Sequence, residues 1–147
     1  MTTVRDLLNI KGEQVWSIGP DASTLEALKL MAQKKIGALL VMDGDALVGI
    51  VSERDFARRF ADIGACAIDA PVKEYMTDEV YYVSPGMSIE KCMHMMTHLH
   101  IRHLPVFEDE KLIGLISIGD VVKEIIRDQE SLIQSMENFI TGRGYGT

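Results

Sequence analysis

The sequence repeats itself at a fixed distance of 65 residues, and the two copies align without a gap. Ten of 38 aligned positions are identical in both copies, and most of the others differ by mild exchanges such as Val48/Ile113. The identical pairs are Pro20/Pro85, Ser23/Ser88, Met31/Met96, Ile36/Ile101, Leu39/Leu104, Val41/Val106, Leu47/Leu112, Gly49/Gly114, Ser52/Ser117 and Asp55/Asp120. A fixed internal period indicates one supersecondary unit used twice, so function is expected where the two copies meet.

Each copy has the pattern of a β-α-β-β-α unit. In the first copy, Ser23 and Glu26 form a capping-box pattern, and apolar residues follow at helical spacing. Short apolar runs separated by a turn signal predict the two strands after this helix. We predict strands at 14–18, 36–42 and 46–51, a helix that opens at Ser23 and carries an apolar stripe to Ala32, and a second helix at about 56–63. In the second copy we predict strands at 80–83, 101–107 and 112–116 and helices at 88–99 and from 117 onward.

Similar short segments, 4–8 and 72–76, precede the two copies, and a further amphipathic stretch at 132–140 follows them before a glycine-rich tail. We therefore predict a first domain at 9–66, a second domain at 72–128, and a C-terminal helix with its tail at 129–147. A copy of about 60 residues is marginally stable alone, so the two copies are expected to share a core.

Composition narrows the class of protein. The 147 residues carry a net charge of −7, which disfavours broad binding to nucleic acid. No apolar run approaches the length of a membrane span, and the N-terminal residues lack the pattern of a signal peptide. Cys66 and Cys92 lie in dissimilar contexts and are expected to be free thiols of a reducing compartment. We predict a cytoplasmic protein.

The repeated pattern Pro-x-x-Ser, helix, Ile-x-x-Leu-x-Val, turn, Leu-[Val/Ile]-Gly-x-[Val/Ile]-Ser-x-x-Asp resembles a pair of CBS domains, the regulatory module named after cystathionine beta-synthase. The likeness covers residues 4–128, and two matches in register make it specific. It implies an α/β (α+β) fold, a stand-alone Bateman module of tandem CBS domains related by a pseudo-two-fold axis. Each domain is expected to have a three-stranded sheet flanked by two helices.

The Ser-x-x-Asp motifs, Ser52/Asp55 and Ser117/Asp120, allow two interpretations. As capping boxes they would stabilise the following helices by about 1 kcal/mol each. As a binding site, each carboxylate would accept hydrogen bonds from two adjacent ribose hydroxyls, while the helix N-terminus faces a phosphate. The family resemblance implies the second use.

The two copies differ where the second strand begins. The second copy has Arg102 and His103, where the first has Gly37 and Ala38. Because successive side chains of a strand alternate, Arg102 and His103 should point to opposite faces. One interpretation is that they form a charged strand end exposed to water. In similar domain pairs this position contacts phosphates, and the guanidinium and the imidazole would both serve. The two sites are therefore not expected to be equivalent.

Trp16 and Tyr81 occupy equivalent positions and are either core residues or walls for adenine. The resemblance implies that each site combines one Ser-x-x-Asp motif with strands of the other copy. In the first site, Ser52 and Asp55 would join Met76, Tyr81, Ile101 and Arg102. In the second, Ser117 and Asp120 would join Lys11, Trp16, Ile36 and Gly37. Arg54, His103 and Gly119 complete the predicted nucleotide-binding set.

No motif for catalysis is recognisable, and we predict neither an enzyme nor a catalytic cofactor. His94 and His98 have the i, i+4 spacing of a zinc-binding pair but lack further ligands at metal-site spacing, so an exposed helix face is the preferred interpretation and no metal site is predicted.

The resulting prediction is a sensor that binds AMP, ADP, ATP or NAD between its copies and signals to an unidentified regulated protein, with a homodimer as the default assembly. It is not expected to bind nucleic acid or a membrane. Two alternatives remain: a structural interaction module with non-functional pockets, and an enzyme or zinc protein.

Overall fold

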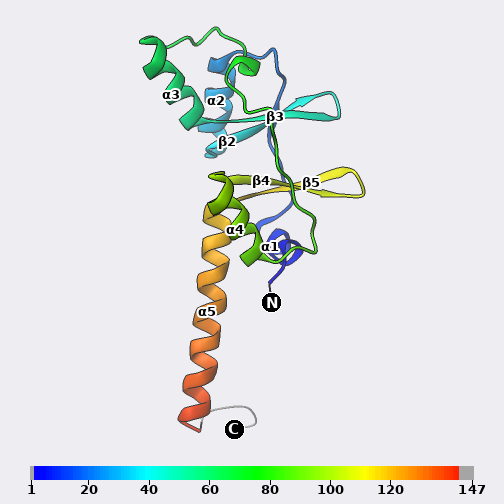
Figure 1. The fold of residues 1–147 in the computed structure, drawn as a ribbon, viewed down its shortest axis with the longest axis vertical. Coiled ribbons are helices and arrows are strands. Elements are labelled where there is room, and N and C mark those ends of the chain that lie inside the picture. Colours follow the sequence, from blue (N-terminus) through cyan, green and yellow to red (C-terminus); the bar gives the residue numbers. More distant parts are fainter. Residues whose placement is uncertain (1, 143–147) are drawn as a thin grey trace. The chain divides into compact units, whose positions relative to one another are not determined.

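The computed structural model describes residues 2–142 of the chain (Figure 1). The chain forms two compact units that do not coincide with the repeats. Val15–Tyr81 make up the first-repeat unit. Met1–Gln14 and Tyr82–Thr147 together make up the second-repeat unit. The segment that precedes the first copy therefore belongs to the unit of the second copy.

The first-repeat unit has the predicted β-α-β-β-α order. Its elements are β1 (Ser17–Ile18), α2 (Thr24–Lys34), β2 (Ala38–Asp43), β3 (Ala46–Ser52), α3 (Glu53–Ile63) and a 3₁₀ turn, η1 (Val72–Glu74). The strands form one sheet in the order β1-β2-β3, with β1 parallel and β3 antiparallel to β2. Its core is apolar because both helices and the sheet turn their apolar residues inward: Ala27, Met31, Leu39, Val41, Val51, Phe56 and Val72 are buried.

The second-repeat unit follows the same plan with a shorter sheet. Its elements are α1 (Val4–Lys11), α4 (Ile89–Leu99), β4 (His103–Glu108), β5 (Lys111–Ser117) and α5 (Ile118–Ile140). β4 and β5 pair antiparallel, and the predicted strand at 80–83 is reduced to a single parallel bridge between Val83 and Val106. Pro105 explains the difference: its counterpart, Leu40, donates its backbone N–H to Trp16, and proline has no N–H to donate.

α5 is one continuous helix of 23 residues, where the sequence predicted a helix and a separate amphipathic stretch. Residues 127–131, Arg-Asp-Gln-Glu-Ser, contain no glycine or proline to interrupt it. α1 and α4 pack against its first part (Figure 1). No helix within residues 2–142 combines the length and the apolar character needed to span a membrane. Most of the predicted glycine-rich tail, residues 143–147, lies outside the described residues.

The two segments that precede the copies are exchanged between the units. The backbone N–H of Val4 donates to the carbonyl of Met87 at 2.9 Å, and that of Val72 donates to Ala22 at 2.8 Å. Ala22 and Met87 are equivalent positions of the two copies, so both segments dock in the same way on the copy that does not follow them. The predicted limits 9–66 and 72–128 describe the sequence repeats, whereas the spatial units follow this exchange.

Candidate ligand-binding site

Both Ser-x-x-Asp motifs are capping boxes at the start of a helix. Ser52 donates its backbone N–H to Asp55 Oδ2 at 2.8 Å, and its hydroxyl accepts from the Asp55 N–H at 3.2 Å. Ser117 and Asp120 have the same bonds at 2.8 and 3.1 Å. Each motif lies at the turn from the last strand of its sheet into the next helix. The capping interpretation of the sequence is therefore confirmed.

The cap bonds hold each aspartate carboxylate through only one of its two oxygens. The backbone N–H of the serine donates to Oδ2 in both residues, and the hydroxyl of Ser52 makes a second contact to Asp55 Oδ2 at 3.0 Å. Both aspartates are half-buried, and both sit in the first turn of a helix. A second carboxylate oxygen, outside the cap, is thus held at a fixed place in each unit.

Lys11 distinguishes the second-repeat unit from the first. Its ammonium donates to Asp120 Oδ2 and to the carbonyl oxygen of Leu115, both at 2.6 Å. Burial raises the pKa of Asp120, but the hydrogen bond and charge of Lys11, with the bonds from Ser117, outweigh it and leave that pKa lowered. In the first-repeat unit the carbonyl of Ile50, the counterpart of Leu115, accepts instead from the backbone N–H of Thr77 at 2.9 Å.

A pocket of about 210 Å³ lies beside Asp55 in the first-repeat unit. It is lined by Asp55, Arg58, Arg59, Asp62, Glu74 and Tyr75. The sequence analysis missed the arginines, although positions 58, 59 and 62 follow Asp55 at the three-, four- and seven-residue spacing of one helix face. Three carboxylates and two guanidiniums leave the lining with a formal charge of −1, so it is not by itself a site for a highly charged phosphate.

The start of the second strand lies next to the cap of its own unit. The N–H of Glu53 donates to the carbonyl of Gly37 at 3.0 Å. In the other unit, the N–H of Ile118 donates to Arg102 at 2.8 Å. The backbone of Arg102 is thereby held beside the Ser117 cap, and its side chain is exposed. His103 is half-buried and lies opposite Ser117 in the β4–β5 ladder.

The two predicted aromatic walls have different surroundings. Trp16 is half-buried against the core of the first-repeat unit, and the ammonium of Lys34 lies 4.2 Å from the centre of its ring. One face of this indole is therefore occupied by a cation. Tyr81 is exposed, and its hydroxyl donates to Glu79 Oε1 at 3.3 Å.

The remaining predicted residues divide between the units. Met76 and Ile36 pack on the first-repeat core, and Ile101 packs on the second. Arg54 and Gly119 are exposed in the first turns of α3 and α5. The structure brings Lys11 to Asp120 within the second-repeat unit, and the assignment of these residues to a nucleotide-binding site stays a prediction.

His94 and His98 are both exposed on α4. Within the described part of the chain there is no group of three or more His, Cys, Asp or Glu side chains placed to hold a metal ion.

Comparison with known proteins identifies the repeat. The family model for the CBS domain matches residues 4–62 and 72–127. The chain is 34% identical to the CBS domain-containing protein CBSX3, mitochondrial, from Arabidopsis thaliana, over 98% of this chain and 74% of that protein. Its sequence is 49% identical to that of the CBS domain protein NE2398, whose crystal structure matches with a TM-score of 0.80 over 85% of this chain and 98% of that one.

Two further solved structures have the same fold. A putative signal-transduction protein with CBS domains from Burkholderia ambifaria is 46% identical, with a TM-score of 0.82, over 87% of this chain and 96% of that one. The CBS domain pair of protein MJ0100, solved in complex with 5′-methylthioadenosine and S-adenosyl-L-methionine, has a TM-score of 0.76 over 87% of this chain and 98% of that one. At 22% identity that likeness shows a shared fold.

Proposed function

Because this chain belongs to the CBS domain family, we propose that it is a regulatory module that binds an adenosine-containing ligand and transmits that binding to a partner protein. The observation that carries the proposal is the pair of fixed carboxylates. In each unit an aspartate is capped through Oδ2 while Oδ1 lies outside the cap. Two adjacent hydroxyls of a ribose are suitable donors for such a carboxylate, and charge-assisted hydrogen bonds contribute about 1.5–3 kcal/mol each.

Adenosine is the favoured nucleoside for two reasons. A protein with the same fold, MJ0100, binds two adenosine derivatives. In addition, the partly buried apolar side chains Ile36, Ile101 and Met76 offer surface for a flat base. AMP, ADP, ATP and NAD all present this nucleoside, and all four are candidates.

The phosphate end is proposed to be read by Arg102 together with His103. Arg102 has an exposed guanidinium, whereas its counterpart in the first copy is Gly37. A guanidinium presents a planar fork of donors that matches phosphate oxygens. The pocket beside Asp55 does not supply this function because its acids outnumber its arginines. Arg102→Ala should therefore weaken binding in proportion to the phosphate charge of the ligand.

Regulation requires that the ligand bind one arrangement of the protein better than another. We propose a non-catalytic, cytoplasmic sensor whose output is a changed surface for a regulated protein. The ligand can shift this equilibrium only by its differential affinity for the two states.

Thermal unfolding with and without each nucleotide tests the proposal. A ligand at 100 times its Kd adds about 2.7 kcal/mol to the stability of the folded state. Asp55→Asn and Asp120→Asn remove the charge and keep the shape, so each should weaken one site by about tenfold or more. Glu26→Gln is the matched control, since Glu26 closes a capping box on α2 with Ser23 and has no place in the proposed site.

The proposal fails if none of AMP, ADP, ATP and NAD raises the melting temperature, and the chain would then be a structural interaction module. It also fails if both aspartate variants bind as tightly as the parent. Mass spectrometry of small molecules released from the denatured protein should identify an adenosine-containing ligand carried through purification.

A further inference from the structure

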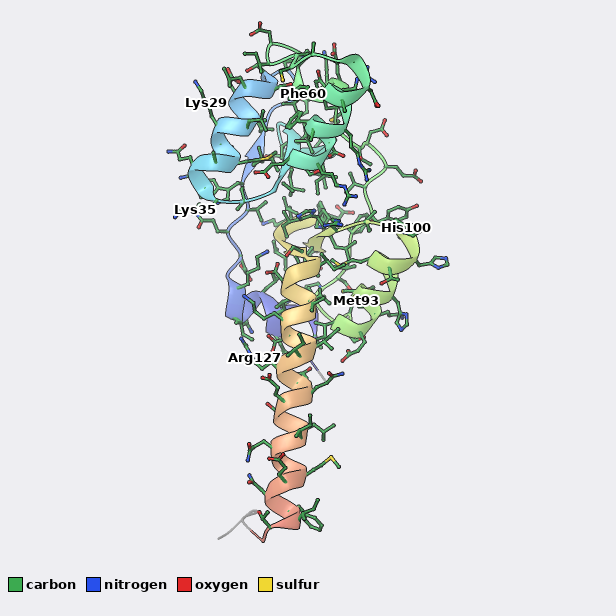
Figure 2. The ribbon with its side chains drawn as sticks, turned by 90° about the vertical axis from the view of Figure 1, so that its left-hand side faces the viewer. Lys29, Lys35, Phe60, Met93, His100 and Arg127 are labelled. Carbon is green, nitrogen blue, oxygen red and sulfur yellow. The ribbon has the colours of Figure 1, made fainter. Side chains whose placement is uncertain are left out.

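The C-terminal half of α5 exposes a continuous row of large apolar side chains. Leu132, Ile133, Met136, Phe139 and Ile140 are 62, 55, 57, 82 and 80% exposed. Among residues 2–142, the last side-chain hydrogen bond from another segment to α5 is that of Thr2 with Asp128. Figure 2 shows the helix continuing past Arg127 with its side chains directed into solvent. A row of this size on a helix indicates a surface that another molecule covers.

The spacing of the row is that of a helix-pairing surface. Alternating steps of four and three residues run along α5, with β-branched or flexible apolar side chains at all positions except one. The positions are Val122, Ile126, Gln129, Ile133, Met136 and Ile140. Two more exposed apolar residues widen the row on one side: Leu132 and Phe139. A row of this period is suited to another helix.

The charged residues of the C-terminal half of α5 favour a protein helix over a lipid surface as the binding partner. Helices that lie on membranes carry lysine and arginine on their polar face. Residues 128–142 contain neither, and their charged residues are Asp128, Glu130 and Glu137. An anionic polar face is repelled by anionic lipids, so the occupant is expected to be protein.

We propose that α5 pairs in antiparallel fashion with α5 of a second copy of this chain. With the two-fold axis at Ser131, every position of the row meets another position of the row. Ile126 faces Met136 of the second copy, Ile133 faces Gln129, and Val122 faces Ile140.

The flanking residues favour the antiparallel orientation. In this register Lys123 lies beside Glu137 of the second copy, and the pair occurs twice by symmetry. On the same flank Glu130 lies beside its own counterpart, and on the other flank Leu132 meets its own counterpart. A parallel pair would instead place Leu132 beside Glu137 of the second copy. Burying a carboxylate against an apolar side chain is unfavourable, so the parallel arrangement is rejected.

Sedimentation equilibrium of the full chain tests the pairing. Ile133→Asp places a charge in the centre of the row, and because Ile133 is exposed in the single chain the fold is retained, as circular dichroism will show. We expect the assembly mass to fall to half that of the parent. Ser131→Asp, on the opposite face of the same turn, is the control and should keep the parent mass. Equal masses for the parent and Ile133→Asp would overturn the proposal.

Charge reversal and cross-linking test the orientation. Lys123→Glu and Glu137→Lys should each raise the dimer Kd severalfold, and the double variant should restore it. In a Cys66→Ser background, mixing Ile126→Cys with Met136→Cys should give a disulfide-linked dimer of the two variants. Met136→Cys alone should give no disulfide. Position 136 faces residue 126 of the second copy, so the other introduced cysteine lies ten residues farther along the partner helix. Efficient cross-linking of Met136→Cys alone would show a parallel pair and overturn the proposal.

Discussion

The side chain of Leu8 lies directly over Gly114, so closely that a Cβ placed on Gly114 would stand 2.6 Å from Leu8 Cδ2. Leu8 is buried and belongs to the segment that docks from the start of the chain. Gly114→Ala should therefore destabilise the protein by about 1–3 kcal/mol, the usual range for overpacking a core. Urea unfolding of the variant and the parent measures the difference.

A second substitution tells whether Leu8 is the cause. Leu8→Ala leaves a cavity and should cost about 2–5 kcal/mol alone. It also removes the atoms that the new methyl group meets, so the double variant should be more stable than the sum of the two single effects predicts. Additive effects would show that Gly114 is required for another reason.

Gly49, the counterpart of Gly114, is predicted to be the less tolerant of the two. A Cβ there would lie 2.5 Å from Met76 Sδ and 2.9 Å from the backbone oxygen of Thr77. A methionine side chain can move aside, but the Thr77 carbonyl is held because it accepts from the N–H of Ile50 at 3.0 Å. Gly49→Ala should thus lower stability more than Gly114→Ala in the same urea experiment. Recovery on adding Met76→Ala would contradict the role of the Thr77 backbone.

Asp120 should make stability depend on pH in the acid range. Its pKa is lowered in the folded protein: burial raises it, but Lys11 and Ser117 outweigh that effect. Its contribution is therefore complete above the pKa of the unfolded chain, about 3.9, and is lost as the pH falls through the lower folded value. Between pH 5 and 3 the urea midpoint of the parent should fall more steeply than that of Asp120→Asn.

Lys11→Gln provides the control for this titration. It removes the ammonium that bonds Asp120 and leaves the cap from Ser117 in place. The variant should show an acid sensitivity between those of the parent and Asp120→Asn. An unchanged pH profile in both variants would mean that other carboxylates dominate the acid range.

Local signals in the sequence were sufficient for most elements and for the caps. Ser23 with Glu26, and Ser52 with Asp55, were predicted to start helices, and they do so because the cap needs only residues three positions apart. The same locality explains the failures. The strand at 80–83 depends on a hydrogen bond that Pro105, far along the chain, cannot donate. A pattern within four residues does not contain that information.

The candidate site shows the same limit. The Ser-x-x-Asp pattern predicts both aspartates as helix caps, which the structure confirms, whereas their place in a nucleotide site with Lys11 rests on the resemblance and stays a prediction. It did not predict that the segment before each copy docks on the other copy, since that choice depends on the chain's path in space. Arg58 and Arg59 lie outside the Ser-x-x-Asp motif, so the motif did not predict them. Their three- and four-residue spacing from Asp55 nevertheless places them on the same helix face.

The cap serines should contribute to stability independently of any ligand. Ser52→Ala and Ser117→Ala each remove the hydroxyl that accepts the aspartate N–H, and each should cost about 1 kcal/mol. Ser88→Ala is a useful comparison, because Ser88 caps α4 by accepting from Lys91 and lies outside the proposed site. Similar losses in all three would confirm ordinary capping, while a far larger loss at Ser52 or Ser117 would require a further role.

The two cysteines should differ sharply in reactivity. Burial, with a smaller effect from the charge of Glu90, raises the pKa of Cys92 to about 11, whereas Cys66 is exposed. At pH 8 only about one part in a thousand of the Cys92 thiol is then thiolate, the form that reacts. Iodoacetamide should modify Cys66 alone in the native protein and both residues in guanidinium chloride, as peptide mass spectrometry will show. The Cys66→Ser variant should not react with iodoacetamide until the protein is unfolded. Labelling of Cys92 in that folded variant, at the rate of an exposed thiol, would mean that the core around α4 opens readily.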